Sequence, residues 1–309
     1  MASGVRAIGA FIKLGRPKFL VGGFVFYGLG AALAVAAGAP FDAARFAWGQ
    51  LVVTAAQLMT HYANDFFDLE ADRANRTPTR WSGGSRILPD GALPPGVALG
   101  AAMVLGALAL GATLALAFRA PDLPLLSPIA VVMTTLAWAY SAPPLRLAAR
   151  GLGELTTAVV VTLCVPLLGY YLQAGDVHPQ IFAASLLPCV LQFAMLLAIE
   201  LPDAAGDAVA GKRTLVVRLG AAAGARLYAA LTIAGFGALP VLASLGALPV
   251  RVAIAPLALA PFAIWQAARV VRGGYADQAR WDSVAFWSVA LLAGSASAAL
   301  VAALTLAFV

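Results

Sequence analysis

The stretch QLMTHYANDFFDLEADRANRTPTRWSGGSR, residues 57–86, begins inside an apolar run and ends among charges. Where it leaves the apolar run, it places Asp65, Asp68 and Asp72 at spacings of three and four. On a helix such residues lie one above another on one face. Carboxylates stacked in this way repel each other, and Mg²⁺, which prefers oxygen ligands, relieves the repulsion. The pattern favours a metal site; the alternative is the solvated polar end of a membrane helix.

A second acidic cluster strengthens the metal interpretation. Glu200, Asp203 and Asp207 follow another apolar run, again at spacings of three and four, and Lys212 comes soon after them. Half of the chain's fourteen acids lie in these two short stretches. Magnesium recruits substrate phosphates as ligands, so the two clusters predict a site that holds a diphosphate through bridging ions.

The segments NDFFDLEAD (64–72) and DAAGD (203–207) resemble the two aspartate-rich motifs of the UbiA superfamily of intramembrane prenyltransferases. The order and separation of the motifs extend this resemblance over nearly the whole chain. It implies one domain, residues 1–309, made of two sequential halves that each carry one motif, at 64–72 and 200–207. It also implies magnesium-dependent transfer of a polyprenyl group from its diphosphate to an aromatic acceptor.

The stretch RGLGE (150–154) resembles UbiA-like proteins in general, and two further stretches resemble the menaquinone-type branch of that superfamily. These two are SGGSR (82–86) and GKRTLVVRLG (211–220). This branch implies 1,4-dihydroxy-2-naphthoate as the acceptor. Acceptors of other branches remain open, namely 4-hydroxybenzoate, homogentisate, chlorophyllide, haem or a glyceryl phosphate lipid. The length of the prenyl chain and the oligomeric state are not specified by the sequence.

The residue pattern and the resemblance together assign roles to particular side chains. The expected catalytic residues are Asp65, Asp68, Asp72, Asp203 and Asp207. The expected ligands of two Mg²⁺ ions are Asn64, Asp65, Asp68, Asp72, Glu200, Asp203 and Asp207. The expected diphosphate-binding residues are Arg76, Arg80, Arg86, Arg146 and Lys212. The expected acceptor or prenyl pocket contains Gln57, His61, Phe66, Phe67 and Tyr140.

Several of these side chains have a plainer alternative role. A helix–helix hydrogen bond explains His61 equally well, and tyrosines such as Tyr140 are common at membrane interfaces. The RPKF stretch at residues 16–19 resembles the same region of the superfamily, but a simple basic anchor explains it at least as well. Glu154, near the start of a predicted span, is costly if buried alone, so we expect it to have a partner.

The composition is that of an integral membrane protein. Charged residues make up 11% of the chain and hydrophobic residues 62%, with a mean hydropathy of +0.89, whereas soluble domains carry about a quarter charged residues. Nine apolar stretches approach the roughly 20 residues that one crossing needs, which predicts an all-α, polytopic bundle of about nine transmembrane helices. They lie near 19–38, 46–65, 97–118, 124–141, 154–174, 180–199, 222–246, 250–269 and 283–308.

The basic residues predict the orientation. Of the 20 lysines and arginines, all but Arg45, Arg119 and Arg251 lie at the N-terminus or in every second connection. Because such residues gather in cytoplasmic loops, we expect the N-terminus inside and the C-terminus outside the cytoplasmic membrane. Both acidic clusters then open to the cytoplasm.

Other function classes fit the sequence less well. The net charge of +6 follows from the cytoplasmic basic loops and their contact with membrane lipid, so we expect no nucleic-acid partner. A cation-coupled transporter is a rival, but transport sites lie near the midplane of the membrane and these acids lie at helix ends. A non-catalytic membrane protein that binds quinones or lipids is a third interpretation.

Overall fold

The computed structural model describes residues 2–307, and within that range it is helical and has no strand. Its α-helices are α1 (Ala2–Leu14), α2 (Pro17–Ala36), α3 (Ala43–Phe67), α4 (Leu69–Ala74), α5 (Pro95–Arg119), α6 (Leu126–Ala139), α7 (Gly153–Val159), α8 (Val165–Ala174), α9 (Pro179–Glu200), α10 (Ala204–Val209), α11 (Leu215–Leu219), α12 (Ala221–Ser244), α13 (Val250–Ile254), α14 (Ala260–Arg269) and α15 (Trp281–Ala307). Shorter segments of tighter or wider helix are η1 (Ala148–Arg150), η2 (Val160–Cys164), η3 (Ala255–Leu259), η4 (Val270–Gly274) and η5 (Gln278–Arg280).

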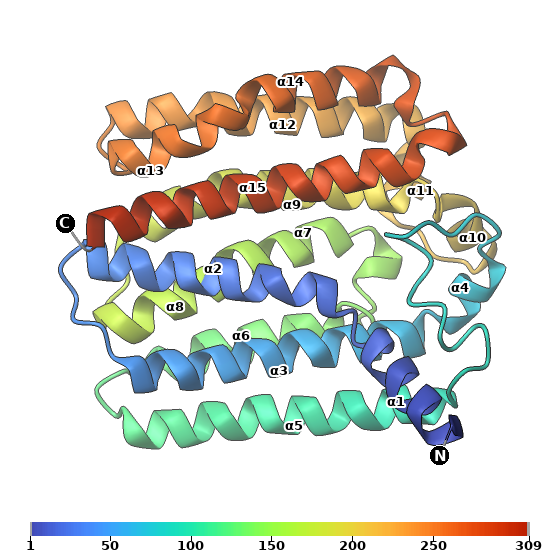
Figure 1. Ribbon diagram of the computed structural model, residues 1–309, viewed down its shortest axis with the longest axis horizontal. Helices are drawn as coiled ribbons and strands as arrows, with labels where there is room; N and C mark the ends of the chain where they lie inside the picture. The colour runs from blue at the N-terminus through green and yellow to red at the C-terminus, as the bar shows by residue number, and fades with distance from the viewer. Residues whose placement is uncertain (1, 308–309) are drawn as a thin grey trace.

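The long helices lie side by side with their axes roughly parallel (Figure 1). The short helices α1, α4, α10 and α11 gather at one end of this bundle, on the right of Figure 1, together with the connection at residues 75–94. We call this end the loop end. Both acidic motifs lie there, because α3 runs into α4 and α9 runs into α10.

Seven helical segments are long and apolar enough to cross a membrane: Pro17–Ala36, Pro95–Arg119, Gly153–Ala174, Pro179–Glu200, Ala221–Ser244, Val250–Gly274 and Gln278–Ala307. They coincide with seven of the nine predicted spans and confirm a multi-pass membrane protein. The other two predicted spans are also helical. Helix α3 has 25 residues but carries the polar motif at its end, and α6 has only 14 residues, short of a full crossing. The number nine therefore stays a prediction, and residue 308 of the last span lies outside the described residues.

Local sequence chemistry explains where these helices begin. The carboxylate of Asp42 accepts hydrogen bonds from the backbone N–H groups of Ala44 and Arg45, both at 2.9 Å, and so caps α3. Proline occupies the first position of α2, α5 and α9, where its missing N–H costs nothing and its fixed φ angle suits a helix. A proline thus begins each of these three long apolar helices.

Small residues bring the central helices into close contact. A Cβ atom added at Gly30 of α2 would lie 1.9 Å from the carbonyl oxygen of Pro166 in α8. The reverse contact is equally tight, since a Cβ at Gly169 would lie 2.3 Å from the carbonyl oxygen of Tyr27. Glycine at both positions lets the two backbones touch, which is how membrane helices commonly pack.

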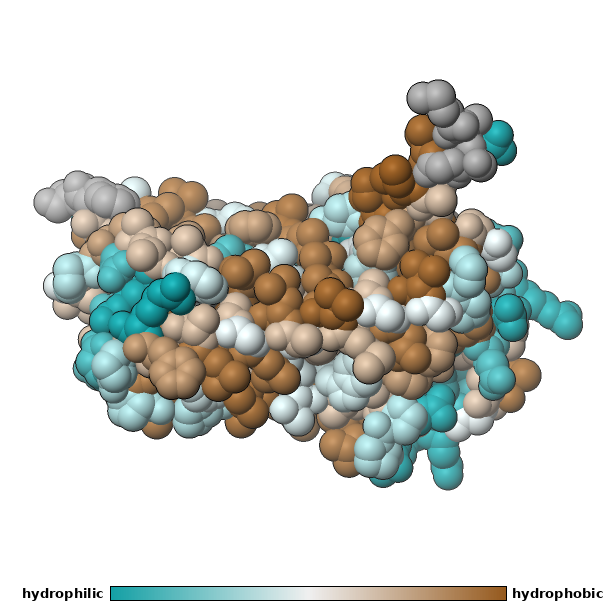
Figure 2. Space-filling model, turned by 90° about the horizontal axis from the view of Figure 1, so that it is seen from below, coloured by the Kyte–Doolittle hydropathy of each residue, from teal (hydrophilic) through white to brown (hydrophobic). Residues whose placement is uncertain are grey.

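The outer surface of the bundle is apolar. Figure 2 shows hydrophobic residues over much of one face, with the most hydrophilic residues towards its two ends. Helix α5, for example, exposes Met103, Val104 and Leu114. In a soluble protein such a surface would be a liability, whereas here it is the surface that faces lipid.

Candidate functional site

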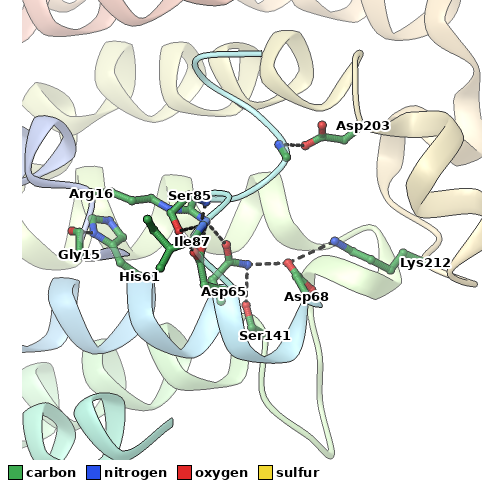
Figure 3. A network of polar contacts seen from close by, with 12 residues as sticks. Gly15, Arg16, His61, Asp65, Asp68, Ser85, Ile87, Ser141, Asp203 and Lys212 are labelled. Carbon is green, nitrogen blue, oxygen red and sulfur yellow. Dashed lines mark hydrogen bonds and ion pairs between the residues drawn. The ribbon is translucent and has the colours of Figure 1, made fainter. Parts of the chain in front are cut away.

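Asp65 lies near the end of α3, buried within a set of polar partners (Figure 3). One carboxylate oxygen forms an ion pair with the guanidinium of Arg16, which precedes α2. The other accepts hydrogen bonds from the backbone N–H of Ser85, at 3.2 Å, and from the Ser85 hydroxyl. Three segments far apart in the sequence therefore meet at one carboxylate.

Asn64 extends this network in two directions. Its Oδ1 accepts a hydrogen bond from Arg16 at 3.1 Å. Its Nδ2 donates to Asp68 at 2.6 Å and to the Ser141 hydroxyl at 3.0 Å. The asparagine thus fixes the position of Asp68, which ends α3, and connects it to the segment that follows α6.

Lys212 joins the two acidic motifs. Its Nζ lies 3.2 Å from Asp68 Oδ2 and 3.1 Å from Asp207 Oδ1, and all three side chains are largely buried. Burial disfavours the ammonium, but Asp68 and Asp207 outweigh it and hold the pKa of Lys212 above its ordinary value. The two clusters predicted to share a site therefore do meet, at a single cation.

The loop between α4 and α5 wraps the remaining acids. Asp203 accepts hydrogen bonds from Asn75 Nδ2 at 2.6 Å and from the backbone N–H of Gly83 at 3.0 Å. A Cβ at Gly84 would lie 2.0 Å from Asp72 Oδ2, so only glycine lets the loop approach that carboxylate. Burial raises the pKa of Asp72 to about 7, with a further contribution from Asp68. Burial likewise raises the pKa of Asp203 to about 6.

The predicted diphosphate-binding residues lie in different places. Lys212 contacts the aspartates directly, whereas Arg86 donates to the backbone carbonyl of Asp72 and pairs with Asp90 at 3.6 Å. Arg80 is exposed and faces Asp282, at 3.7 Å. Arg76 and Arg146 are also exposed.

The prediction omitted Arg16, whose side chain forms an ion pair with Asp65 of the first motif. The sequence feature that could have pointed to Arg16 is the RPKF stretch, residues 16–19.

Two buried glutamates lie where spanning helices end. Glu200 is the last residue of α9 and Glu154 lies in the first turn of α7. Within residues 2–307, Oε2 of Glu200 and both carboxylate oxygens of Glu154 lack a hydrogen-bond partner. The neighbour of Glu154 is Glu200 itself, and two carboxyl groups can form a hydrogen bond only when one of them carries a proton. Buried carboxylates without partners are costly, so these oxygens require a proton, a water molecule or a ligand.

A cavity of about 430 Å³ begins next to this network and continues into the bundle between α2, α3, α6, α7, α9 and α15. Arg16, Asn64, His61 and Tyr140 line its polar end. Apolar side chains make up most of the remaining lining, including Phe26, Met133, Val165, Leu292 and Ala296. The cavity is therefore charged at its opening and mostly apolar in its interior.

The predicted pocket residues divide between this cavity and the protein core. Gln57, His61 and Tyr140 line the cavity. Phe66 and Phe67 are not among its lining residues; Phe67 packs edge-on against Trp138, with ring centroids 5.9 Å apart. The expectation for the two phenylalanines needs correction. Phe66 lies two residues after Asn64 and so points to another side of the helix, whereas Phe67 lies three residues after Asn64 but is held against Trp138 at the end of α3.

Comparison with known proteins identifies the family. The model of the UbiA prenyltransferase family matches residues 24–290. The chain belongs to this family. A search of curated protein sequences found no match.

Solved UbiA structures share the fold at low sequence identity. A digeranylgeranylglyceryl phosphate synthase is 18% identical with a TM-score of 0.64, and the alignment covers 97% of this chain and 99% of that one. A UbiA homologue from Aeropyrum pernix K1 is 18% identical with a TM-score of 0.66, covering 89% and 96%. A UbiA homologue from Archaeoglobus fulgidus, bound to DMAPP and Mg²⁺, is 15% identical with a TM-score of 0.61, covering 96% and 99%. At these identities the similarity shows the fold.

The donor groups of this UbiA chain suit magnesium. Within residues 2–307, no three His, Cys, Asp or Glu side chains are arranged to hold one ion. Magnesium does not need such a cage, since it is usually bound by one or two carboxylates together with substrate phosphates. Asp68 and Asp207 already converge on one positive charge, that of Lys212. The residues therefore fit a cation that brings its own phosphate ligands.

Proposed function

We propose that this chain transfers a polyprenyl group from its diphosphate to an aromatic acceptor. The observation that supports this proposal most directly is the cavity. Its polar end is lined by Asn64, which begins the first aspartate motif, and by Arg16, which contacts that motif. An allylic diphosphate has the same division, with a charged head and an apolar tail. Its head fits the network at the loop end, and its tail fits the apolar interior.

The reaction breaks the allylic C–O bond and forms a C–C bond to the acceptor ring. The electron pair of the C–O bond leaves with the diphosphate, and the ring then loses a proton or, from a carboxylated carbon, CO₂. Mg²⁺ held by Asp65, Asp68 and Asp72 on one side and by Asp203 and Asp207 on the other would neutralise the charge that develops on the leaving diphosphate. We assign Asn64 and Glu200 to the same ligand set.

Fixed cations of the chain complete the binding of the head group. Arg16 and Lys212 already lie against carboxylates of the two motifs, and both can turn donors towards phosphate oxygens. Arg86 lies in the same loop as Gly83, which contacts Asp203 of the second motif, and Gly84, which contacts Asp72 of the first. Arg76, Arg80 and Arg146 are exposed, and we assign them a longer-range role in attracting the anionic substrate.

The cavity walls protect the allylic cation from water. The interior of the cavity is apolar over most of its lining, so water has few partners there. The rings of Phe19, Trp81 and Tyr140 also line it, close to the polar end. Aromatic faces stabilise a nearby cation, and these rings take the role that the sequence had suggested for Phe66 and Phe67.

We favour 1,4-dihydroxy-2-naphthoate as the acceptor, in menaquinone biosynthesis. The support is the resemblance of SGGSR (82–86) and GKRTLVVRLG (211–220) to that branch. A glyceryl phosphate lipid is the chief alternative, since the same fold occurs in a digeranylgeranylglyceryl phosphate synthase. We infer from the bias of the basic residues that the loop end, and with it the site, faces the cytoplasm.

The test is an assay of the purified protein in detergent. The protein is incubated with Mg²⁺, farnesyl or geranylgeranyl diphosphate and a panel of acceptors, and products are followed by mass spectrometry with and without EDTA. We expect a decarboxylated prenyl naphthoquinol that EDTA abolishes and that neither Asp65→Ala nor Asp203→Ala forms. Product with another acceptor would support prenyl transfer but would assign the protein to a different biosynthetic pathway. No product with any acceptor, from folded protein, would overturn the proposal; the next assay would then be cation-driven uptake.

A further inference from the structure

His61 lies on α3 one turn further into the bundle than Asp65, at the junction between the polar and apolar parts of the cavity. Its ring lines the cavity beside Asn64 and Arg16. In the proposed reaction, the allylic carbon lies just inside the diphosphate. The imidazole is therefore at the depth where the acceptor must meet that carbon.

The hydrogen bond of His61 fixes its tautomer. Its Nδ1 lies 2.7 Å from the backbone carbonyl oxygen of Gly15 (Figure 3). A carbonyl oxygen has only lone pairs to offer, so Nδ1 carries the proton, and in the neutral ring Nε2 is left as a hydrogen-bond acceptor. Among residues 2–307, Nε2 has no hydrogen-bond partner. It is also not one of the polar atoms that are fully buried without a partner, so it remains accessible from the cavity.

Gln57 repeats this arrangement one turn deeper on the same helix. Its Nε2 donates a 2.7 Å hydrogen bond to the carbonyl oxygen of Phe19, and its side chain also lines the cavity. Each side chain thus donates one hydrogen bond to a backbone carbonyl at or just before the start of α2. This part of the wall consequently offers acceptor atoms to whatever occupies the cavity.

We propose that Nε2 of His61 accepts a hydrogen bond from a ring hydroxyl of the prenyl acceptor. This inference rests on the proposed prenyl transfer and names the side chain that would bind and orient the acceptor ring. The diphosphate cannot be the partner, since its oxygens are also acceptors. The prenyl chain cannot be the partner either, since it is a hydrocarbon. The acceptor is the one reactant that carries a donor.

The contact has two consequences for the acceptor. It orients the ring, because a hydroxyl held at Nε2 leaves the ring carbons facing the mouth where the allylic carbon lies. It also selects the acceptor, because a bound ligand that lacks the hydroxyl would leave Nε2 of His61 buried without a hydrogen-bond partner. Sites that bind one hydroxyl in this way discriminate strongly against analogues without it. His61 is then an acceptor-binding residue, and its bond to Gly15 is what aims it.

Two substitutions separate this role from a purely structural one. The amide of His61→Asn can still donate to the Gly15 carbonyl in place of Nδ1, but it has no atom at the position of Nε2. The amide of His61→Gln reaches the position of Nε2 and supplies an oxygen acceptor there, but it gives up the short contact to Gly15. A structural histidine would tolerate asparagine better than glutamine, whereas an acceptor-binding histidine would tolerate glutamine better.

The measurement is the dissociation constant of paired acceptor ligands, determined by direct binding to the purified protein without prenyl diphosphate. Each pair consists of the hydroxylated naphthoate and its analogue with one hydroxyl replaced by hydrogen, so that differences in ring reactivity do not enter. We expect wild type to prefer the hydroxylated ligand by about tenfold for one of the two hydroxyls. His61→Asn should reduce that ratio to about one, and His61→Gln should restore part of it, while the KM for prenyl diphosphate stays within about twofold in all three proteins.

The outcomes distinguish the two proposals. If wild type forms no prenylated product, the proposed function fails, and this inference fails with it. If wild type is active and His61→Asn keeps the wild-type ratio for both hydroxyls, prenyl transfer stands and the role of His61 is overturned. A ratio lost in His61→Asn with an unchanged thermal unfolding midpoint supports it.

Discussion

Lys212 and Asp68 form an ion pair of 3.2 Å between the two halves of the chain. The lysine follows α10 and the aspartate ends α3. Because the same ammonium also lies 3.1 Å from Asp207, one positive charge is shared by a carboxylate from each motif. The site is therefore held together by charge compensation as well as by packing.

Replacing Lys212 with methionine should destabilise the protein. The substitution leaves Asp68 and Asp207 close together and largely buried without their cation, and breaking such a pair costs about 3–5 kcal/mol. We expect a lower midpoint of thermal unfolding in detergent. Mg²⁺ with diphosphate should raise that midpoint more in the variant than in wild type, because the metal takes over the missing charge. Arg146→Met, at an exposed arginine, is the matched control, and equal midpoints for the two variants would contradict the interpretation.

Binding of Mg²⁺ should weaken as the pH falls from 8 to 6. Burial raises the pKa of Asp72 to about 7 and that of Asp203 to about 6, and a carboxylate must be ionised to bind the metal. Both values exceed the unfolded value of about 3.9, so folding takes up protons between about pH 4 and 7. The metal-free protein should accordingly lose stability as the pH rises through that window.

The pH dependence is measured by the shift of the unfolding midpoint with Mg²⁺ and diphosphate at pH 6, 7 and 8. Asp72→Asn cannot ionise and should flatten the change between pH 7 and 8. A Mg²⁺ affinity that is the same at pH 6 and pH 8 in wild type would count against ionisation of these two carboxylates as the controlling step.

The parts of the site that the sequence predicts are those with local patterns. The spacing of Asp65, Asp68 and Asp72 is visible within a short stretch of sequence, residues 65–72, and apolar length marks the spanning helices. The meeting of Asp68 with Asp207 was also predicted, although only from two clusters of similar composition. The structure brings them together at Lys212.

The parts that the sequence does not reveal depend on tertiary geometry. Arg16 reaches Asp65 because the corner between α1 and α2 packs beside the end of α3, and no local pattern encodes that approach. Ser85 reaches the same carboxylate only through the fold of the loop. Phe66 and Phe67 illustrate a false prediction. They lie close to Asp65 along the chain, but a helix turns by about 100° per residue, so their side chains point to other faces than that of Asp65.

The contact between α2 and α8 makes a separate prediction about stability. Gly30→Ala places a Cβ atom 1.9 Å from the Pro166 carbonyl oxygen, so the helices must move apart, at a cost of about 1–3 kcal/mol. Gly111→Ala in α5 is the control, since among residues 2–307 its Cβ would meet no atom within 4 Å. Unfolding midpoints in detergent should fall for the first variant and hold or rise for the second, because alanine is the better helix former. A midpoint of Gly30→Ala equal to that of wild type would show that α2 and α8 are not tightly packed.

Filling the apolar part of the cavity should shorten the prenyl chain that the protein accepts. Ala296 lines the cavity two turns further along α15 than Val289, which also lines it. A phenylalanine at residue 296 occupies space that a long chain needs but leaves the polar end intact. We expect Ala296→Phe to lower kcat/KM for geranylgeranyl diphosphate at least tenfold relative to that for dimethylallyl diphosphate. Val301→Phe, on the exposed side of the same helix, should leave the ratio unchanged. If both variants kept the wild-type ratio, the tail would have to lie outside this cavity.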